Sequence, residues 1–475
     1  MSLKKNFIYN TSYQLLNIFL PLITVPYIAR VLGVTNTGIY SYTGAYTQYF
    51  ILLGMLGINI YGRRQIAYVK DNKEKLSRDF SNIYTLQLIS TLISLVSYLI
   101  IFVGINEEYK IVYLIQGINI LASVVDISWL YIGFENIKSI VLKNLIVKVI
   151  GIIMIFTFVK TRNDLIIYAV IMSGSLFIGQ LLMWINMRKI IDFVKPEKKE
   201  IIKHLKPTLG LFISQMAIQV YALLDKTMLG AMTDTWQVGL YENSQKTIKI
   251  ILTIATSLGT IMLPRMSSLY SNGKIGEFKK LIYNAFSFVN FIAFPMVFGL
   301  IAISNRFAIW FYGVEFTGIE VLLKLGSFII IAISWSNILG MQVMIPMQRE
   351  KEFTISVVVG AIVNLILNLF LIKSLKASGA MISSIVAETT VAFVQVYLLR
   401  HIVNWKRILL SCIKPFIGSV SMYIIIGRVF IEISSNFIYL ISTICGGCIV
   451  YMIIMILLKD IFIKEALNTL RRKVR

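Results

Sequence analysis

Cysteine, proline and acidic residues are scarce in this sequence: three cysteines, eight prolines and 23 Asp or Glu in 475 residues. So few cysteines exclude a small secreted fold held together by disulfides. Charged residues make up 15% of the chain and hydrophobic residues 57%, whereas soluble domains carry about 25% and about 45–50%. This composition excludes disordered and collagen-like chains and predicts a protein whose solvent is lipid.

The motifs of enzymes are also missing. The sequence contains no G-x-x-x-x-G-K-S/T phosphate loop, no H-E-x-x-H and no G-x-S-x-G. We expect both histidines, His204 and His401, to be solvated in polar connections. The connections predicted on the outer side, the longest near 231–245 and 305–319, are too short to fold as a catalytic domain. We therefore predict a protein that is not an enzyme and needs no cofactor beyond a coupling ion, H⁺ or Na⁺.

Long apolar runs dominate what the sequence does contain. A helix of roughly 20 apolar residues crosses the ~30 Å hydrocarbon core of a bilayer. These runs are continuously apolar, which indicates helices and not barrel strands. We count fourteen, with twelve as the alternative, approximately at 8–30, 38–60, 82–104, 111–134, 144–160, 164–187, 207–231, 246–268, 284–304, 320–346, 353–373, 379–400, 408–430 and 436–458.

The positive charge is distributed unevenly between the two sides of this predicted bundle. Of the 46 Lys and Arg residues, 32 fall in one alternating set of connections, nine in the opposite set and five within or at the edge of predicted helices. Cytoplasmic connections carry the excess of Lys and Arg, so both termini are predicted to be cytoplasmic. The net charge of +23 thus reflects topology and contact with membrane lipids, and no nucleic-acid partner is expected.

An internal repeat suggests how the helices are grouped. Residues 30–33 (Arg-Val-Leu-Gly) precede Gly-Ile-Tyr at 38–40, and residues 226–230 (Lys-Thr-Met-Leu-Gly) precede Gly-Leu-Tyr at 239–241. Six predicted helices separate the two instances, as in transporters built from parallel repeats; chance similarity is the alternative. We predict two pseudo-symmetric six-helix lobes, with boundaries at 1–190 for the N-terminal lobe, 191–206 for a cytoplasmic linker, 207–402 for the C-terminal lobe and 403–475 for two extra helices and a basic tail.

Ionisable residues inside predicted helices are costly and indicate function. Asp126, Asp225 and Glu388 are candidates for ion coupling, with structural ion pairs between helices as an equally weighted alternative. Five lysines against these three acids favour an anionic substrate, because Lys and Arg bind phosphate oxygens through charge-assisted hydrogen bonds. The candidate phosphate ligands are Arg30, Lys148, Lys226 and Lys249, although Lys148 and Lys249 lie near helix ends where snorkelling to headgroups explains them equally well.

Aromatic and polar residues along the second predicted helix complete a candidate sugar site. Tyr46, Tyr49 and Gln48 lie on a polar-aromatic stretch that is unusual for a lipid-facing helix. Tyrosine rings on a hydrated path can stack against sugars. Tyr40 and Tyr42 belong to the same stretch, and anchoring at the membrane interface accounts for these two just as well.

Several fragments in order resemble the bacterial polysaccharide repeat-unit flippases, the Wzx-type polysaccharide transporter branch of the MOP superfamily, over about residues 5–400. They are Val-Pro-Tyr-Ile-Ala-Arg-Val-Leu-Gly at 25–33, Gly-Ile-Tyr at 38–40, Gly-Arg-Arg-Gln-Ile-Ala at 62–67, Asp-Lys-Thr-Met-Leu-Gly at 225–230, Gly-Leu-Tyr at 239–241, Leu-Pro-Arg at 263–265, Gly-Met-Gln at 340–342, Asn-Leu-Ile-Leu-Asn at 364–368 and Gly-Ala at 379–380 leading to Glu388.

This resemblance implies an all-α, multi-pass protein of the bacterial cytoplasmic membrane with the MOP flippase fold. The implied activity is translocation of undecaprenyl-diphosphate-linked oligosaccharide between leaflets by alternating access, for capsule, exopolysaccharide or O-antigen. A polysaccharide polymerase and a chain-length regulator are the implied protein partners. Related flippases contact the diphosphate through arginines of the first helices, which Arg30 matches except that it lies at the outer end of its helix. Two alternatives stay open, a MATE-like small-molecule exporter and a membrane polysaccharide polymerase.

Overall fold

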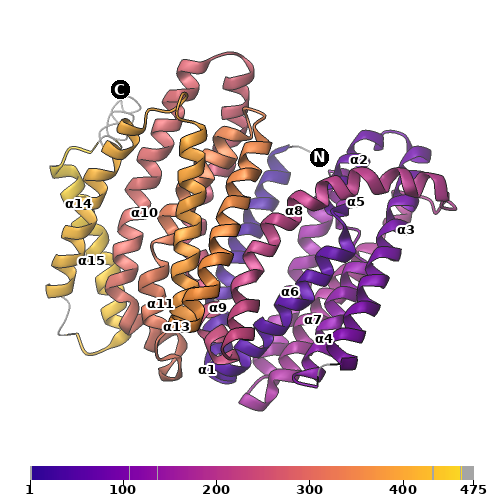
Figure 1. The fold of residues 1–475 in the computed structure, drawn as a ribbon, viewed down its shortest axis with the longest axis horizontal. Coiled ribbons are helices and arrows are strands. Elements are labelled where there is room, and N and C mark those ends of the chain that lie inside the picture. The colour runs from indigo at the N-terminus through magenta and orange to yellow at the C-terminus, as the bar shows by residue number, and fades with distance from the viewer. Residues whose placement is uncertain (1–2, 106, 136, 430–432, 461, 463–475) are drawn as a thin grey trace. The chain divides into compact units, whose positions relative to one another are not determined.

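The computed structural model describes residues 3–105, 107–135, 137–429, 433–460 and 462, and the predicted basic tail at 463–475 lies outside them. Within the described residues every regular element is a helix (Figure 1). A helix satisfies its own backbone N–H and C=O groups, which a lipid solvent requires. The chain divides into two compact units, Met1–Gly230 and Ala231–Arg475.

The first unit is built around α1, which packs on α3 and α4, while α4 also packs on α7. Short helices α2 and α5 pack on each other at one end of this unit. Its elements are α1 (Leu3–Met55), α2 (Ile58–Val69), α3 (Lys73–Tyr98), η1 (Leu99–Ile105), α4 (Lys110–Val124), α5 (Ser128–Gly133), α6 (Ile137–Phe158), η2 (Arg162–Asp164), α7 (Leu165–Trp184), η3 (Met187–Lys189) and α8 (Lys198–Met232), whose last two residues belong to the second unit.

The second unit is organised around α10, which packs on α9, α11, α12, α14 and α15. Its elements are α9 (Thr235–Ser271), α10 (Ile275–Tyr312), η4 (Val314–Phe316), α11 (Ile319–Gly326), α12 (Ile329–Ser336), η5 (Asn337–Met344), α13 (Glu350–Leu398), α14 (Trp405–Val429) and α15 (Asn436–Leu457). The predicted lobes, separated by the linker at 191–206, are groups of helices expected to move together. The two compact units are defined by packing, so the division into lobes stays a prediction.

The helices are long and apolar enough to cross a membrane many times. Nine segments of the described chain pass as spans, or ten with the bent helix α9. At 1.5 Å per residue, the 53 residues of α1 extend about 80 Å, more than twice the ~30 Å hydrocarbon core. α1 is kinked at Gly33 (φ 77°) and α13 at Lys376 (φ 52°), so each contains two predicted spans. α6 and α8 overlap the fifth and seventh predictions, and each of the fourteen predicted runs overlaps helical elements over most of its length.

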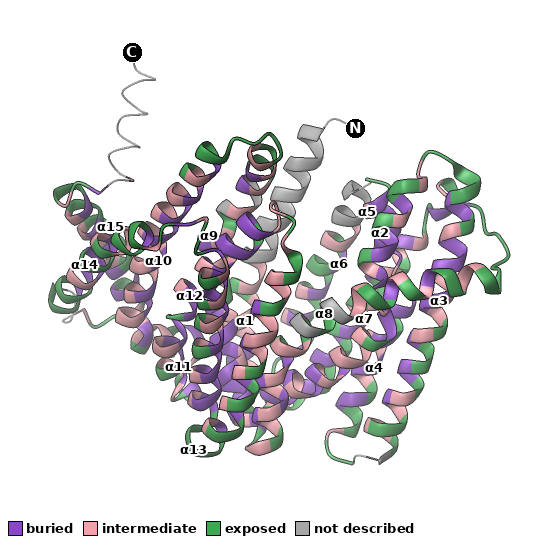
Figure 2. Ribbon diagram, turned by 45° about the horizontal axis from the view of Figure 1, so that its top comes forward, coloured by how far each residue is buried: buried purple, intermediate pink, exposed green. Residues whose placement is uncertain are grey.

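Exposed apolar side chains continue along the outer surfaces of these helices, as expected where lipid replaces water. Figure 2 shows exposed residues along α14 and α15 in particular. Examples are Leu410 on α14 and Ile449 on α15, which are 65% and 61% exposed. The polar residues instead turn inward: Gln87, Gln116, Asn290 and Gln395 are fully buried. This inside-out distribution is what a multi-pass membrane protein requires.

Residues 190–197, which we call the strap, lie along α3 without regular secondary structure before α8 begins. Three backbone N–H groups of the strap donate to α3 side chains: Asp192 to Ser77 Oγ (3.0 Å), Val194 to Ser81 Oγ (3.3 Å) and Glu197 to Asn82 Oδ1 (2.9 Å). Ion pairs join Lys73 to Asp192 (2.8 Å) and Arg78 to Glu197 (2.9 Å). The first part of the predicted linker is therefore fixed to the first unit, and its second part is helical.

The prediction that His204 is solvated was wrong. α8 begins at Lys198, earlier than the polar sequence suggested, and presents His204 to α2. The imidazole is 6% exposed, and its Nδ1 lies 2.6 Å from the Tyr61 hydroxyl. Burial lowers the pKa of His204 below its ordinary value. His401, in contrast, is exposed, as predicted.

Candidate functional site

Three tyrosines form a stripe on the second half of α1. Tyr42, Tyr46 and Tyr49 follow a spacing of four and then three residues, which places them on one face of a helix. The Tyr42 and Tyr46 hydroxyls are 3.3 Å apart, and their rings meet edge to face with centroids 5.1 Å apart. Tyr46 and Tyr49 continue the contact at 6.4 Å. All three residues are half-buried, so each keeps some accessible surface, as a site that contacts sugar rings must.

The C-terminal part of α8 packs against this tyrosine stripe. The Tyr49 hydroxyl lies 3.3 Å from Thr227 Oγ1. A Cβ at Gly230 would come within 2.2 Å of the Tyr42 ring, so only glycine allows this approach. Asp225, within electrostatic range of Tyr49, is 6% exposed, and Lys226 beside it is half-buried. The structure thus gathers the predicted residues Tyr46, Tyr49, Asp225 and Lys226 in one region of the first unit.

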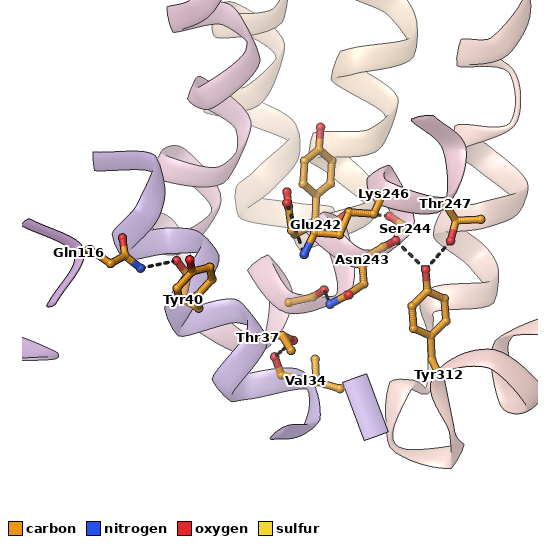
Figure 3. Close-up of polar contacts among 12 residues, drawn as sticks. Val34, Thr37, Tyr40, Gln116, Glu242, Asn243, Ser244, Lys246, Thr247 and Tyr312 are labelled. Carbon is orange, nitrogen blue, oxygen red and sulfur yellow. Dashed lines mark hydrogen bonds and ion pairs between the residues drawn. The ribbon is translucent and has the colours of Figure 1, made fainter. Parts of the chain in front are cut away.

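A second stripe of α1 packs inside the first unit, where its residues form hydrogen bonds with Gln116 on α4. Gln116 Nε2 donates to the Tyr40 carbonyl (2.9 Å) and to Thr43 Oγ1 (2.9 Å), while its Oε1 accepts from Thr47 Oγ1 (3.1 Å); Figure 3 shows the bond to Tyr40. Tyr98 from α3 joins through Thr47 (2.9 Å). Sequence analysis missed Gln116 because a lone glutamine in an apolar run carries no motif. The network holds α1 in place behind the tyrosine stripe.

Gln48 and Arg30 lie elsewhere on α1. Gln48 is half-buried, directly before Tyr49 in sequence. Arg30 is exposed, three residues before the kink at Gly33. At the same end of the unit, Asn36 Nδ2 donates to the Arg162 carbonyl (2.7 Å) and the Tyr27 hydroxyl to the Val159 carbonyl (2.7 Å). Arg30 therefore lies at a helix end, as the sequence suggested, and its role in binding phosphate stays a prediction.

Asp126 and Lys148 occupy less central positions in the first unit. Asp126 lies in the break between α4 and α5, where its Oδ1 accepts the Ser128 N–H at 2.8 Å. This hydrogen bond lies at the first residue of α5. It favours a structural role for the Asp126 carboxylate over a role in ion coupling. Lys148 lies on α6 with an exposed side chain. Ion coupling by Asp126 and phosphate binding by Lys148 remain predictions.

In the second unit, polar residues gather on the first turns of α9 (Figure 3). Glu242 and Lys246 form an ion pair at 3.8 Å, one turn apart. The Tyr312 hydroxyl donates to the Asn243 carbonyl (2.7 Å) and contacts Thr247. Lys249, one turn beyond Lys246, is exposed. Sequence analysis missed the pair because residues 231–245 were assigned to a connection, although Asp234 and Gln237 have the spacing of a helix start.

Glu388 lies on α13, one turn after Ser384. The Ser384 hydroxyl is 2.9 Å from the Tyr241 hydroxyl on α9, and Gln245 Nε2 donates to Tyr241 at 3.1 Å. Glu388 is half-buried beside this polar contact between α9 and α13. Its position inside a buried helix pair is compatible with ion coupling, which stays a prediction. In the described part of the chain, no three His, Cys, Asp or Glu residues are grouped to hold a metal ion.

Fold and site together define a multi-pass, all-helical membrane protein with a polar, partly aromatic interior. The sequence matches the family described as polysaccharide biosynthesis protein over residues 3–270, more than half of the chain. The chain belongs to this family. The predicted resemblance to a polysaccharide biosynthesis family is thereby confirmed.

Individual relatives agree with this assignment. The chain is 27% identical over 416 residues to the "Putative O-antigen transporter" of Escherichia coli (strain K12), covering 84% of this chain and 97% of that protein. It is also 26% identical over 146 residues to the lipid II flippase MurJ of Bacillus subtilis (strain 168), covering 30% of this chain and 26% of that protein.

Solved structures share the fold. The inward closed conformation of the lipid II flippase MurJ superposes with a TM-score of 0.77 at 16% identity, covering 96% of this chain and 99% of that chain. An inward-facing multidrug resistance MATE transporter of the MOP superfamily gives 0.60 at 13% identity, covering 82% of this chain and 95% of that chain. The predicted MOP fold is thus confirmed.

Proposed function

We propose that this protein is a flippase that moves lipid-linked oligosaccharide units across the bacterial cytoplasmic membrane for surface polysaccharide synthesis. The match to the polysaccharide biosynthesis family and to nearly the full length of the O-antigen transporter of Escherichia coli supports this function most. The lipid II flippase from Bacillus subtilis and the glycan flippase Agl15 from Haloferax volcanii match shorter parts of the chain. These names favour transport over the polymerase alternative.

The tyrosine stripe and the cations give this activity a physical basis. Tyr46 and Tyr49, with Gln48 beside them, offer ring faces and hydrogen bonds to sugars. Arg30, Lys148, Lys226 and Lys249 would bind the diphosphate. Asp225 is the main candidate for ion coupling because it is buried, with Glu388 and Asp126 as further candidates.

Alternating access would come from movement of the predicted lobes, residues 1–190 and 207–402. The excess of Lys and Arg in alternate connections supports an orientation with both termini in the cytoplasm. A polysaccharide polymerase and a chain-length regulator are the protein partners this activity would require, since flipped units must be joined outside.

Deletion of the gene tests this function directly. Lipid-linked repeat units should accumulate in the cytoplasmic leaflet and disappear from surface labelling with a sugar-specific lectin, and the wild-type gene should restore labelling. A strain without paralogues is needed as the host. Normal surface labelling in the deletion strain would refute the flippase assignment.

Export of small molecules is the second candidate, supported by the likeness to a MATE transporter fold. The count of five lysines against three acids in the predicted helices opposes it, since cationic drugs favour acidic cavities. The same deletion strain separates the two: an exporter predicts increased susceptibility to several drugs with intact surface polysaccharide, whereas a flippase predicts the reverse pattern.

A further inference from the structure

The short helix α2 has two faces of different chemistry. Ile58, Tyr61, Gly62 and Ile66 are buried on one side. The opposite side, which we call the outer face, is exposed and carries Ile60, Arg63, Arg64, Ala67 and Tyr68. At 100° per residue these five positions fall within one stripe of the helix. Tyr68 is 74% exposed and Ile60 39%, so apolar groups and cations share the outer face.

The buried side fixes the direction in which the outer face points. A Cβ at Gly62 would lie 2.6 Å from the Trp129 ring, and one at Gly133 would lie 2.7 Å from the Arg63 carbonyl. Gly57, in the left-handed turn before α2 (φ 79°), leaves equally little room beside α8. Helix α2 is therefore held tightly against α5 and α8, and its outer face is a permanent surface of the first unit.

Three neighbouring cations form ion pairs with carboxylates, whereas Arg63 and Arg64 form none with the residues that the structure describes. Lys70 pairs with Glu135 at 2.8 Å, and Lys73 and Arg78 pair with acids of the strap. Among the described residues, neither Arg63 nor Arg64 has a carboxylate within 4.0 Å. Asp126 is within electrostatic range of Arg63, but it bonds the Ser128 N–H; the Arg64 guanidinium lies 5.9 Å from the Tyr61 ring centre.

We propose that the outer face of α2 binds anionic phospholipid headgroups of the cytoplasmic leaflet, with Arg63 and Arg64 on the phosphate. Guanidinium groups form paired hydrogen bonds with phosphate oxygens. Helices that lie in the membrane surface combine cations with aromatic and aliphatic anchors on the lipid side, as Arg63, Arg64, Tyr68 and Ile60 do here. The location follows from the chain, because α2 forms the end of the candidate membrane segment Leu20–Val69, and headgroups lie where such a segment leaves the hydrocarbon core.

Native mass spectrometry of the purified chain titrated with phosphatidylglycerol, without any lipid-linked sugar, tests this site. Arg63→Gln with Arg64→Gln should weaken binding about 25-fold, since each cation near an anionic surface contributes about five-fold. Lysine at both positions should retain most of the binding. The matched control is Lys198→Gln with Lys199→Gln, which removes two exposed charges from the start of α8. Unchanged binding in the arginine variant, or an equal loss in the control, would overturn the proposal.

Competition with undecaprenyl diphosphate separates lipid from substrate. The arginine variant should lose affinity for phosphatidylglycerol and keep its affinity for undecaprenyl diphosphate. The opposite result would assign the outer face to the transported molecule and refute the headgroup site.

Spin labels measure the depth of the outer face independently of binding. In a chain whose three cysteines are replaced, labels at Ile60→Cys and Tyr68→Cys should be protected from a water-soluble relaxation agent by bilayers containing phosphatidylglycerol. The control label at Lys75→Cys, on an exposed residue at the start of α3, should stay fully accessible. Equal accessibility at all three positions would contradict the proposal.

Discussion

Burial separates the predicted site residues into two physical kinds. Asp225 is almost fully buried, whereas Arg30, Lys148 and Lys249 are exposed. A buried ionisable group in a membrane protein is costly to retain and marks function or a specific partner. Exposed cations at helix ends carry little free-energy cost, so their presence does not by itself indicate function. A change in transport on mutation would show that they bind substrate.

Replacing Arg30 tests whether it contacts phosphate. Arg30→Ala should slow the appearance of surface polysaccharide about ten-fold, since a charge-assisted hydrogen bond contributes roughly 1.5–3 kcal/mol. Arg30→Lys should cause a smaller loss because it keeps the charge and removes only the paired geometry. Lys160→Ala, at an exposed cation of the same end, is the control. Wild-type rates in both Arg30 variants would exclude it from the site.

Asp225→Asn should abolish the dependence of transport on an ion gradient, because the amide cannot exchange a proton or balance a cation. The measurement is flux into proteoliposomes with and without an imposed H⁺ or Na⁺ gradient. Asp234→Asn is the matched control, since an asparagine oxygen can still accept the Gln237 N–H at the start of α9. A gradient dependence that survives in Asp225→Asn would return this residue to a structural role.

The sequence predicts which residues share a helix face, but it does not predict the residues that pack against that face. The spacing of Tyr42, Tyr46 and Tyr49 indicates a common helix face. Their contact with Thr227 and Gly230 depends on how two helices far apart in sequence pack, which no local pattern encodes. Gln116 could not be predicted either, because its importance comes from three partners on another helix.

At the scale of helices, apolar runs predicted where spans lie but not where they end. The break predicted after residues 30–33 appears as the kink at Gly33. The start of α9 was placed eleven residues too late, at 246 instead of Thr235. Charged residues such as Glu242 and Lys246 lower the hydropathy of a segment. Because these two form an ion pair one turn apart, they can still lie within a helix of the membrane protein.

The packing of α2 on α5 depends on the absence of a side chain at Gly62. Gly62→Ala should destabilise the protein by about 1–3 kcal/mol. The Trp129 ring cannot yield easily because it is fully buried and its Nε1 donates to Gln87 at 2.9 Å. Gly174→Ala, in open space on α7, should be neutral or slightly stabilising. Thermal unfolding in detergent measures both, and equal melting temperatures would refute the packing argument.

The strap should loosen when its acceptors on α3 are removed. Ser81→Ala and Asn82→Ala remove the acceptors of two backbone N–H groups, and the loss of about 0.5–1.5 kcal/mol for each bond favours local opening. Chymotryptic cleavage after Phe193 should become about ten-fold faster or more. Thr85→Ala is the control, since the Thr85 hydroxyl donates only to its own helix. Unchanged cleavage in the double variant would show that these bonds do not hold the strap.

At the scale of the whole molecule, the distribution of Lys and Arg predicts which side of the membrane each connection faces. In a chain with its three free cysteines replaced, Val314→Cys should react with a membrane-impermeant maleimide added outside intact cells. Lys274→Cys should react only after the cells are opened. Both positions are exposed, so access alone cannot explain a difference. Outside labelling of Lys274→Cys would invert the proposed orientation.

The strap determines which residues can change among related chains. Its bonds to α3 use backbone N–H groups, which every residue except proline supplies. Residues 192, 194 and 197 can therefore change identity and keep these three bonds, while Ser77, Ser81 and Asn82 supply acceptors that few side chains could replace. Among related chains we expect a variable strap without proline at those three positions, facing a far more constant α3.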